Sequence, residues 1–167
     1  MSETEISADI PDWSRESKSA RSWNPSRSLL RSIRDYQNAR GLFSPVARKF
    51  AIVRHRLWSV VTGADIPINS TIKGGLLLPH PNGIVIHPQA EIGCNCLIFQ
   101  QVTIGATRGG IPTIGGHVDI GAGAKIIGPI KVGDHAKIGA NAVVREDVPP
   151  HGVFVANAGM ILNRKQF

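Results

Sequence analysis

Aliphatic residues return at every sixth position through the second half of the chain. The series runs through Ile86, Ile92, Ile98 and Ile104, then Ile114, Ile120, Ile126, Val132, Ile138 and Val144. This period fits neither the repeat of about 3.6 residues in a helix nor the two-residue alternation of a single strand. Short strands stacked in successive turns do produce it, so the pattern predicts a mainly β fold built as a parallel solenoid.

The residues two places before these aliphatics are mostly small or aliphatic, as at Ala90, Val118 and Ala124. Because residues i and i−2 of an extended segment point to the same side, both sets are predicted to fill one core. Glycine directly follows several of the aliphatics, which suits corners where a larger side chain would clash. Each hexad is therefore interpreted as one short strand plus a corner, and three hexads would close a triangular turn, stacked on the next at about 4.8 Å.

Ahead of the repeat, residues 1–63 are predicted to form a basic extension with one or two helices, and residues 64–167 the solenoid with a C-terminal tail. The expected helices cover residues 24–40, with Pro25 in the first turn, and residues 46–61. The second helix carries an apolar stripe of Val46, Phe50, Val53, Leu57, Val60 and Val61. A solenoid needs its ends covered, so this stripe is predicted to cap the first coil. Contact with a membrane surface is an alternative that the same basic, amphipathic pattern allows, but it is not favoured.

The net charge of +7 alone suggests nucleic-acid binding, but the distribution of the basic residues along the chain argues against it. Most of the excess lies between residues 15 and 56, outside the solenoid, and no nucleic-acid-binding motif accompanies it, so that class is excluded. The polar residues 1–14 are expected to be disordered and lack the apolar core of a signal peptide. No apolar stretch approaches the roughly 20 residues of a membrane span, and we therefore expect a cytoplasmic protein.

The chain has two cysteines, Cys94 and Cys96. Cys96 falls on one of the small, inward positions of the repeat. It is therefore interpreted as a buried small hydrophobic residue rather than part of a disulfide or a metal site.

Residues 65–80 with 83–86, residues 100–105 and residues 120–128 carry more specific patterns than the hexad alone. At fixed offsets they resemble the repeat domain of the serine acetyltransferases, which are hexapeptide-repeat acyltransferases. The resemblance covers residues 60–153 and implies a left-handed parallel β-helix. The handedness rests on the family alone, because the general rule for crossovers favours the right hand. The resemblance also implies acetyl-CoA as co-substrate, a small-molecule hydroxyl acceptor and a homotrimer.

In that family a histidine takes the proton of the acceptor hydroxyl, and an aspartate fifteen residues earlier orients it. The matching positions hold His80 and Asp65. A neutral imidazole can remove the proton as the hydroxyl attacks a thioester, and a carboxylate stabilises the imidazolium that forms. The backbone N–H near Ala106 would stabilise the oxyanion by the same analogy. Taken alone, His80 could equally be an exposed corner residue.

The resemblance places acetyl-CoA along a cleft between neighbouring coils, where small residues let the pantetheine arm approach the backbone. The matching positions are Ala106, Thr107, Ala122 and Ala140, with Lys137 near the nucleotide phosphates. Alanines and lysines with this spacing also occur in any hexapeptide coil. In the family trimer the cleft lies between subunits, so the catalytic pair and part of the CoA wall would come from different chains. We expect no metal.

The sequence departs from the family where serine would be recognised. Pro79 replaces the aspartate before the histidine, and Gly110 and Ile111 replace an Arg-His pair. A charged ligand buried without partners is strongly disfavoured. The favoured hypothesis is therefore an acetyl-CoA-dependent O-acetyltransferase acting on a sugar or polysaccharide precursor.

Three alternatives stay open. The first is a serine acetyltransferase whose serine contacts come from elsewhere, and the second is a non-catalytic scaffold solenoid. The third is a metal protein resembling the γ-carbonic anhydrases, for which His80, His117 and His135 would have to converge.

Overall fold

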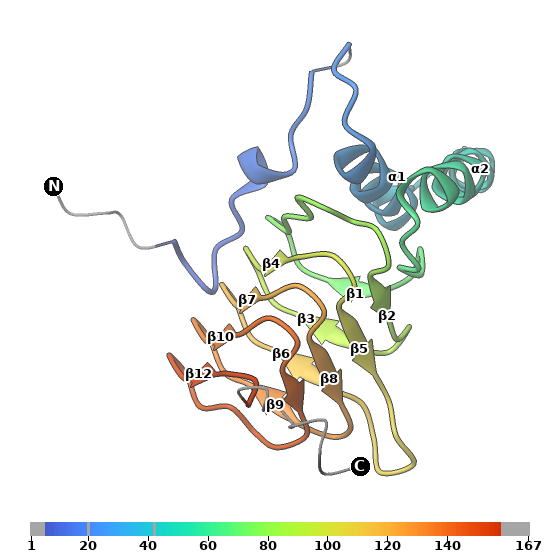
Figure 1. Cartoon of the computed structure of the whole chain (residues 1–167). Coiled ribbons are helices and arrows are strands. Elements are labelled where there is room, and N and C mark those ends of the chain that lie inside the picture. The colour runs from blue at the N-terminus through green and yellow to red at the C-terminus, as the bar shows by residue number, and fades with distance from the viewer. Residues whose placement is uncertain (1–5, 20, 42, 158–167) are drawn as a thin grey trace, which may run out of the picture.

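The computed structural model describes residues 6–19, 21–41 and 43–157. Over these ranges the chain winds into a three-sided solenoid, with a pair of helices at its N-terminal end (Figure 1). The strands are β1 (Thr71–Ile72), β2 (Val85–Ile86), β3 (Glu91–Ile92), β4 (Leu97–Ile98), β5 (Thr103–Gly105), β6 (Thr113–Ile114), β7 (Asp119–Ile120), β8 (Lys125–Ile127), β9 (Lys131–Val132), β10 (Lys137–Ile138), β11 (Val143–Val144) and β12 (Val153–Phe154). Each hexad supplies one strand, so the predicted parallel solenoid is confirmed.

The strands form three parallel sheets, one on each side of the coil. The β1 face contains β1, β3, β6 and β9; the β4 face contains β4, β7, β10 and β12; and the β2 face contains β2, β5, β8 and β11. Equivalent aliphatics stack in register, for example Ile86 on Ile104 and Ile104 on Ile126. All three side chains are at most 1% exposed, so the hexad pattern predicted the core correctly.

Glycine at one corner is required by the close approach of the next turn. A Cβ atom on Gly93 would lie 2.4 Å from the carbonyl carbon and oxygen of Gly115. Those atoms belong to the backbone of the following coil and cannot move aside alone. The spacing of the coils therefore depends on a hydrogen at this position.

We expect Gly93→Ala to lower the free energy of unfolding by about 1–3 kcal/mol, the usual cost of overpacking a tight interior. Gly105→Ala is the matched control, because its Cβ would meet only side-chain ends, Ile127 at 3.2 Å and Thr103 at 3.7 Å, and no backbone atom. Urea unfolding followed by circular dichroism measures both variants. Equal midpoints for the two would contradict the packing argument.

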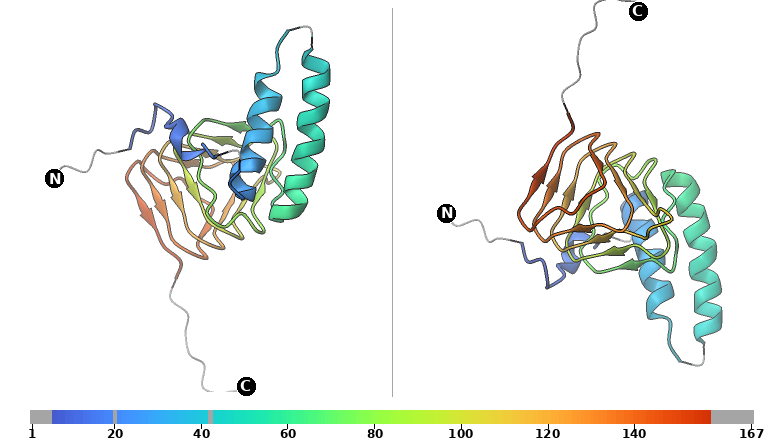
Figure 2. Two further views of the ribbon diagram at one scale, coloured as in Figure 1. Left: turned by 90° about the horizontal axis from the view of Figure 1, so that it is seen from above. Right: turned by 90° about the horizontal axis from the view of Figure 1, so that it is seen from below.

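The helices are α1 (Pro25–Asn38) and α2 (Ser44–Thr62). The Asn24 side chain caps α1 by accepting from the Arg27 N–H at 3.0 Å, and Gly63 ends α2 in the left-handed conformation. Figure 2 shows α1 over the open end of the coil, with α2 on its outer side. Both lie close to the ranges expected from the sequence.

The cap is α1, and the prediction that α2 covers the first coil is wrong. Leu29, Leu30 and Ile33 of α1 are at most 1% exposed and join the core of the solenoid. On α2, by contrast, Phe50 and Val60 are 64% and 83% exposed. The helix that buries its apolar side chains on the coil is thus the one with fewer of them, while α2 contacts the coil only through the inner side that carries His55 and Trp58.

Residues 6–16, the N-terminal strap, run along the corners that join the β1 face to the β4 face (Figure 1). Buried Asn95 fastens the strap: its Oδ1 accepts from the Asp12 N–H at 2.8 Å, and its Nδ2 donates to the carbonyls of Ser7 at 2.7 Å and Ile10 at 2.8 Å. The predicted disorder is therefore wrong for residues 6–14, because long-range hydrogen bonds order them; residues 1–5 lie outside the described ranges.

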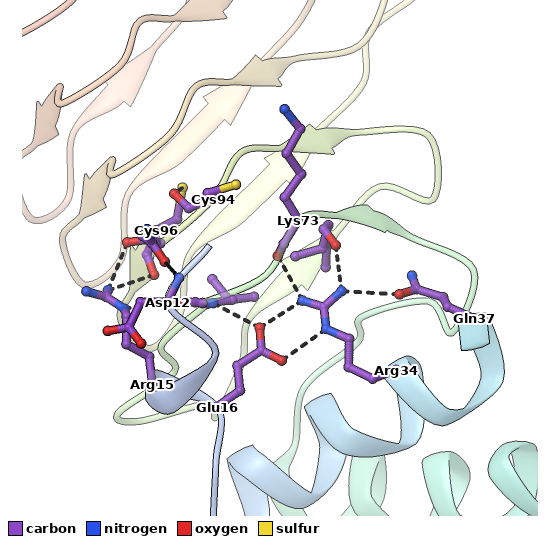
Figure 3. A network of polar contacts seen from close by, with 12 residues as sticks. Asp12, Arg15, Glu16, Arg34, Gln37, Lys73, Cys94 and Cys96 are labelled. Atoms are coloured by element: carbon purple, nitrogen blue, oxygen red, sulfur yellow. Dashed lines mark hydrogen bonds and ion pairs between the residues drawn. The ribbon is translucent and has the colours of Figure 1, made fainter. Parts of the chain in front are cut away.

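An ion pair joins the strap to the cap and the coil (Figure 3). Arg34 of α1 donates from Nε and Nη2 to the two carboxylate oxygens of Glu16, at 3.0 and 2.8 Å. Its guanidinium also donates to the carbonyls of Ile72 at 2.6 Å and Lys73 at 2.8 Å. Glu16 in turn accepts from the Leu76 N–H at 3.0 Å. One arginine thus links three segments that are distant in sequence.

Candidate active site

The corners that join the β4 face to the β2 face form one edge of the solenoid, which we name the His80 edge. It contains residues 79–83, 99–101, 121–123 and 139–141. Backbone hydrogen bonds connect successive corners: Gln101 N–H to Asn82 O at 3.0 Å, Gly123 N–H to Gln100 O at 2.9 Å, and Asn141 N–H to Ala122 O at 2.8 Å. The edge is therefore a continuous, regular surface from the first turn to the last.

His80 is exposed and lines a cavity of about 680 Å³ between this edge and the cap. The corner that carries it is held to the end of α2 by a hydrogen bond from the Gly83 N–H to the Gly63 carbonyl, at 2.8 Å. The helical extension supplies the opposite wall with Trp23, Asn24, Ser26 and Arg27. The cavity thus places polar groups of the extension opposite the predicted base.

Arg27 is the functional candidate that the sequence did not reveal. It lies in the first turn of α1, lines the same cavity as His80, and donates to the carbonyl of Ser17. Trp23 beside it packs edge-on against Trp58 of α2, with ring centroids 5.7 Å apart. Because the extension has no repeat, no periodicity in the sequence pointed to these positions.

Asp65 lies in the first turn of the β2 face, where its backbone pairs with Val85. Its side chain is exposed, and within the described residues no hydrogen bond or ion pair joins it to His80. Catalytic hydrogen bonds are often long in unliganded sites and tighten when substrate binds. The catalytic pair is therefore still a prediction, with both members in the first turns of the solenoid.

His55 of α2 is the histidine on which the charge of Asp65 acts. Its Nε2 lies 2.8 Å from the carbonyl oxygen of Ile66. Burial lowers the pKa of His55 below its ordinary value, and the hydrogen bond to Ile66 and the charge of Asp65 oppose that shift only partly. This ring is held by the backbone of the first turn, and it does not line the cavity that contains His80.

The expected CoA residues divide between two edges. Ala122 and Ala140 lie on the His80 edge, two and three corners beyond His80, which corresponds to about 10 and 14 Å at the normal spacing of strands. Ala106 and Thr107 lie at the other end of β5, in a tight turn closed by the Thr107 N–H and the Gly110 carbonyl at 2.9 Å. Within one chain these two residues are not brought together with His80.

The remaining positions singled out in the sequence lie as follows. Lys137 is exposed on β10, on the β4 face. Pro79 lines the cavity beside His80. Gly110 has a φ of 144° and packs on Pro129, where an added Cβ would approach to 2.7 Å, so this loop lies against the next coil.

The other histidines do not converge on His80. His117 and His135 lie on the corners that join the β1 face to the β4 face, with their Nδ1 atoms 2.9 Å apart, and His135 stacks on His151 at 4.8 Å. Among the residues that the structure describes, no group of three or more His, Cys, Asp or Glu side chains could hold a metal ion. Within one chain His80 therefore lies on a different edge from His117 and His135, and these three side chains do not converge there.

Cys96 is fully buried at its inward position, as predicted, and Cys94 is 2% exposed. Both thiols are free. Burial raises the pKa of Cys96 to about 12, so this thiol stays protonated and unreactive near neutral pH.

Comparison with known proteins identifies a matching family model and similar relatives. The model of the family described as "Bacterial transferase hexapeptide (six repeats)" matches residues 112–146. The serine acetyltransferase of Mycobacterium tuberculosis is 37% identical over 141 residues, which cover 82% of this chain and 62% of that protein.

Solved structures agree with the sequence matches. Soybean serine acetyltransferase complexed with serine superposes with a TM-score of 0.64 at 36% identity, over 80% of this chain and 54% of that one. A serine acetyltransferase in complex with CoA gives a TM-score of 0.67 at 32% identity, over 80% of this chain and 55% of that one.

The chain spans 54–62% of the length of these three relatives, and the shared part includes the solenoid. The solenoid has the left-handed β-helix fold of the serine acetyltransferases, so the predicted fold class, including its handedness, is confirmed. With the six-residue repeat and these matches, the solenoid of this chain is of the serine acetyltransferase-like hexapeptide-repeat type.

Proposed function

We propose that the protein is an acetyl-CoA-dependent O-acetyltransferase whose acceptor is L-serine, with His80 as the general base. The observation that supports this most directly is the cavity that His80 shares with Arg27. A base and a cation that line the same cavity suit an acceptor that carries both a hydroxyl and a carboxylate.

The chemistry assigned to His80 is a proton transfer in each direction. The neutral imidazole takes the proton of the acceptor hydroxyl while the oxygen forms a bond to the thioester carbonyl carbon. When the carbon–sulfur bond of the tetrahedral species breaks, the imidazolium returns the proton to the departing thiolate. Asp65 stabilises the imidazolium between the two steps, and backbone N–H groups near Ala106 stabilise the oxyanion.

The choice of serine reverses the preference for a sugar acceptor that the sequence alone favoured. That preference depended on Pro79, Gly110 and Ile111, which offer no charge to an amino acid. The relatives carry the name serine acetyltransferase, and Arg27 offers a cation from a different part of the chain. A guanidinium binds a carboxylate in a two-pronged geometry, so Arg27 supplies the contact that the shortened loop lacks.

Acetyl-CoA is assigned to the His80 edge of one subunit and the Ala106 corner of its neighbour in a homotrimer. The separation of Ala106 and Thr107 from His80 within one chain supports a site shared between subunits. Ala122 and Ala140 would let the pantetheine arm lie close to the backbone, and Lys137 would attract the nucleotide phosphates.

Replacement of Arg27 by methionine is expected to raise the KM for L-serine by about 10–150-fold, since a hydrogen bond to a charged group contributes about 1.5–3 kcal/mol. The KM for acetyl-CoA should stay constant. The assay is thiol release from acetyl-CoA, with L-serine, L-serinamide, hexoses and nucleotide sugars as acceptors. L-serinamide lacks the carboxylate, so the variant should lose its preference for serine over this analogue, which a merely structural defect would not produce.

Arg31→Met is the matched control, because Arg31 is exposed on the same helix and does not line the cavity. Faster turnover of a hexose or nucleotide sugar than of L-serine would restore the sugar hypothesis. Activity on no acceptor, together with no binding of CoA in calorimetry, would favour the scaffold.

A further inference from the structure

The outward face of α2 is apolar and uncovered. Five large side chains at helical spacing share it and are between 57% and 83% exposed: Val46, Phe50, Val53, Leu57 and Val60. Buried Ala51 and half-buried Trp58 lie on the other side of the helix, toward α1 and the core. Scattered apolar residues are ordinary on a protein surface, but a contiguous stripe along a whole helix indicates a binding surface.

The charge of the same segment is of one sign. No aspartate or glutamate occurs between Asp35 and Asp65, whereas five arginines and lysines do. On a helix of about 3.6 residues per turn, Lys49 and Arg56 lie on one flank of the stripe and Arg54 on the other. An apolar stripe bordered by cations is complementary to a partner that has an apolar interior and anionic groups at its outer surface.

Two of the five cations already have partners within the helical extension. Arg54 bonds to Asp35 at 2.7 Å, and Arg48 stacks over Tyr36 at 5.5 Å from the ring centroid. Lys49 and Arg56, both exposed, are not part of any such pair in the described residues. The flank that carries them is therefore available to an external anion.

Charge also argues against a second copy of this helix as the occupant. Two α2 helices packed antiparallel, stripe to stripe, would bring Lys49 and Arg56 of both copies to the same boundary, and a parallel pair would bring them to Arg54 of the other copy. Neither helix contains an acidic residue to compensate them. Like charges at that distance are destabilising, so self-pairing is the weaker explanation.

The position of α2 on the outside of the molecule would allow its stripe to contact a flat partner surface. In both views of Figure 2 α2 lies on the outer side of α1, with the coil beyond it. Its 19 residues correspond to a rod of about 28 Å. In the described residues no helix is long and apolar enough to cross a membrane, so a lipid-bound α2 would lie along the surface.

We propose that α2 binds the surface of an anionic lipid bilayer, with the Val46–Val60 stripe among the acyl chains and Lys49 and Arg56 at the headgroups. This is the membrane contact that the sequence allowed but did not favour while α2 was expected to be the cap. The proposal does not rest on the proposed catalytic function.

The test is cosedimentation of the full chain with vesicles of phosphatidylcholine, with and without phosphatidylserine. The wild type should bind the phosphatidylserine vesicles at least about tenfold more tightly, and added salt should weaken this binding. The double variants Phe50→Gln/Leu57→Gln and Lys49→Gln/Arg56→Gln should each lose at least about tenfold in affinity.

Val153→Gln/Val155→Gln is the matched control, because these side chains are 68% and 66% exposed but lie on the last turn of the solenoid. It should bind vesicles like the wild type. No binding by the wild type, or equal binding by all variants, would overturn the proposal.

Light scattering without lipid tests whether a second copy of this chain, rather than a lipid bilayer, covers the stripe. If Phe50→Gln/Leu57→Gln changes the mass of the assembly, the stripe is an interface between copies of this chain and the lipid proposal is wrong. An unchanged mass with lost vesicle binding supports it. Thiol release measured without lipid should be unaffected by the stripe variants, so failure of this proposal and failure of the proposed function give different results.

Discussion

His80→Ala should lower kcat at least about a hundredfold while the affinity for CoA stays the same. The reason is that an alcohol attacks a thioester poorly at neutral pH unless a base removes its proton during the attack. His80 is exposed in a cavity and lies two corners from Ala122, so its loss removes the base without disturbing the expected pantetheine path. Stopped assays of thiol release, with CoA binding measured by calorimetry, separate the two effects.

His87→Ala is the appropriate control for this variant. His87 follows β2 at the corner that joins the β2 face to the β1 face, and its Nδ1 accepts from the Gln89 N–H at 3.3 Å. It should retain the kcat of the wild type. Asp65→Asn should cost less than His80→Ala, because it weakens the orientation of the imidazole and leaves the base in place. Turnover of His80→Ala within a few-fold of the wild type would remove this residue from the mechanism.

Arg34→Ala is expected to cause the largest loss of stability, about 3–5 kcal/mol of unfolding free energy. The side chains of Arg34 and Glu16 are only 12% and 8% exposed. Removing the arginine leaves the Glu16 carboxylate without its counter-charge, and the carbonyls of Ile72 and Lys73 lose their donor. Chemical denaturation should show a lower midpoint for the variant, measured by circular dichroism and by tryptophan fluorescence.

Arg54→Ala provides the comparison, since it breaks an ion pair of similar length in a different environment. Arg54 and Asp35 are 2.7 Å apart, but their side chains are 26% and 43% exposed. Water screens such a pair, and we expect a change below about 1 kcal/mol. If the two arginine variants unfold at the same denaturant concentration, burial does not govern the strength of the Arg34 pair.

The solenoid could be predicted from the sequence because every turn has the same physical requirement for buried aliphatic side chains. Each inward position of a strand must hold an aliphatic side chain, as at Ile98 and Ile120, and ten such positions make the period unambiguous. His80 and Asp65 were identified because family motifs lie at fixed offsets within that repeat. In both cases the information is local in sequence or periodic.

The choice of capping helix could not be predicted because apolar content was a misleading guide. The capping face of α1 includes Ser28 and Ser32, which are 3% and 0% exposed. Their hydroxyls donate within the helix, to Asn24 O at 2.9 Å and Leu29 O at 2.6 Å, so burial leaves no donor unpaired. These small side chains leave room for close packing on the end of the coil, while α2 keeps the richer stripe for the exterior.

The contacts that the N-terminal extension makes with the solenoid could not be predicted from sequence patterns for a different reason. Arg27 reaches the cavity of His80 through the placement of α1, and Asn95 holds the strap through single hydrogen bonds across 83–88 positions. Interactions that occur once have no period, so only the folded chain reveals them.

The strap also constrains the order in which the protein can fold. On the ribosome residues 6–16 emerge well before their anchors, Asn95 and the turn at Gly116, which follow about a hundred residues later at roughly 5–20 residues per second. Each coil needs only its predecessor, so the turns can form in sequence as they are made. Among the described residues the strap closes the longest loops, and it must dock after the second and third turns exist. Residues 6–16 are thus secured only after these turns have formed, and until then their docking corner, including the side-chain amide of Asn95, is open to solvent.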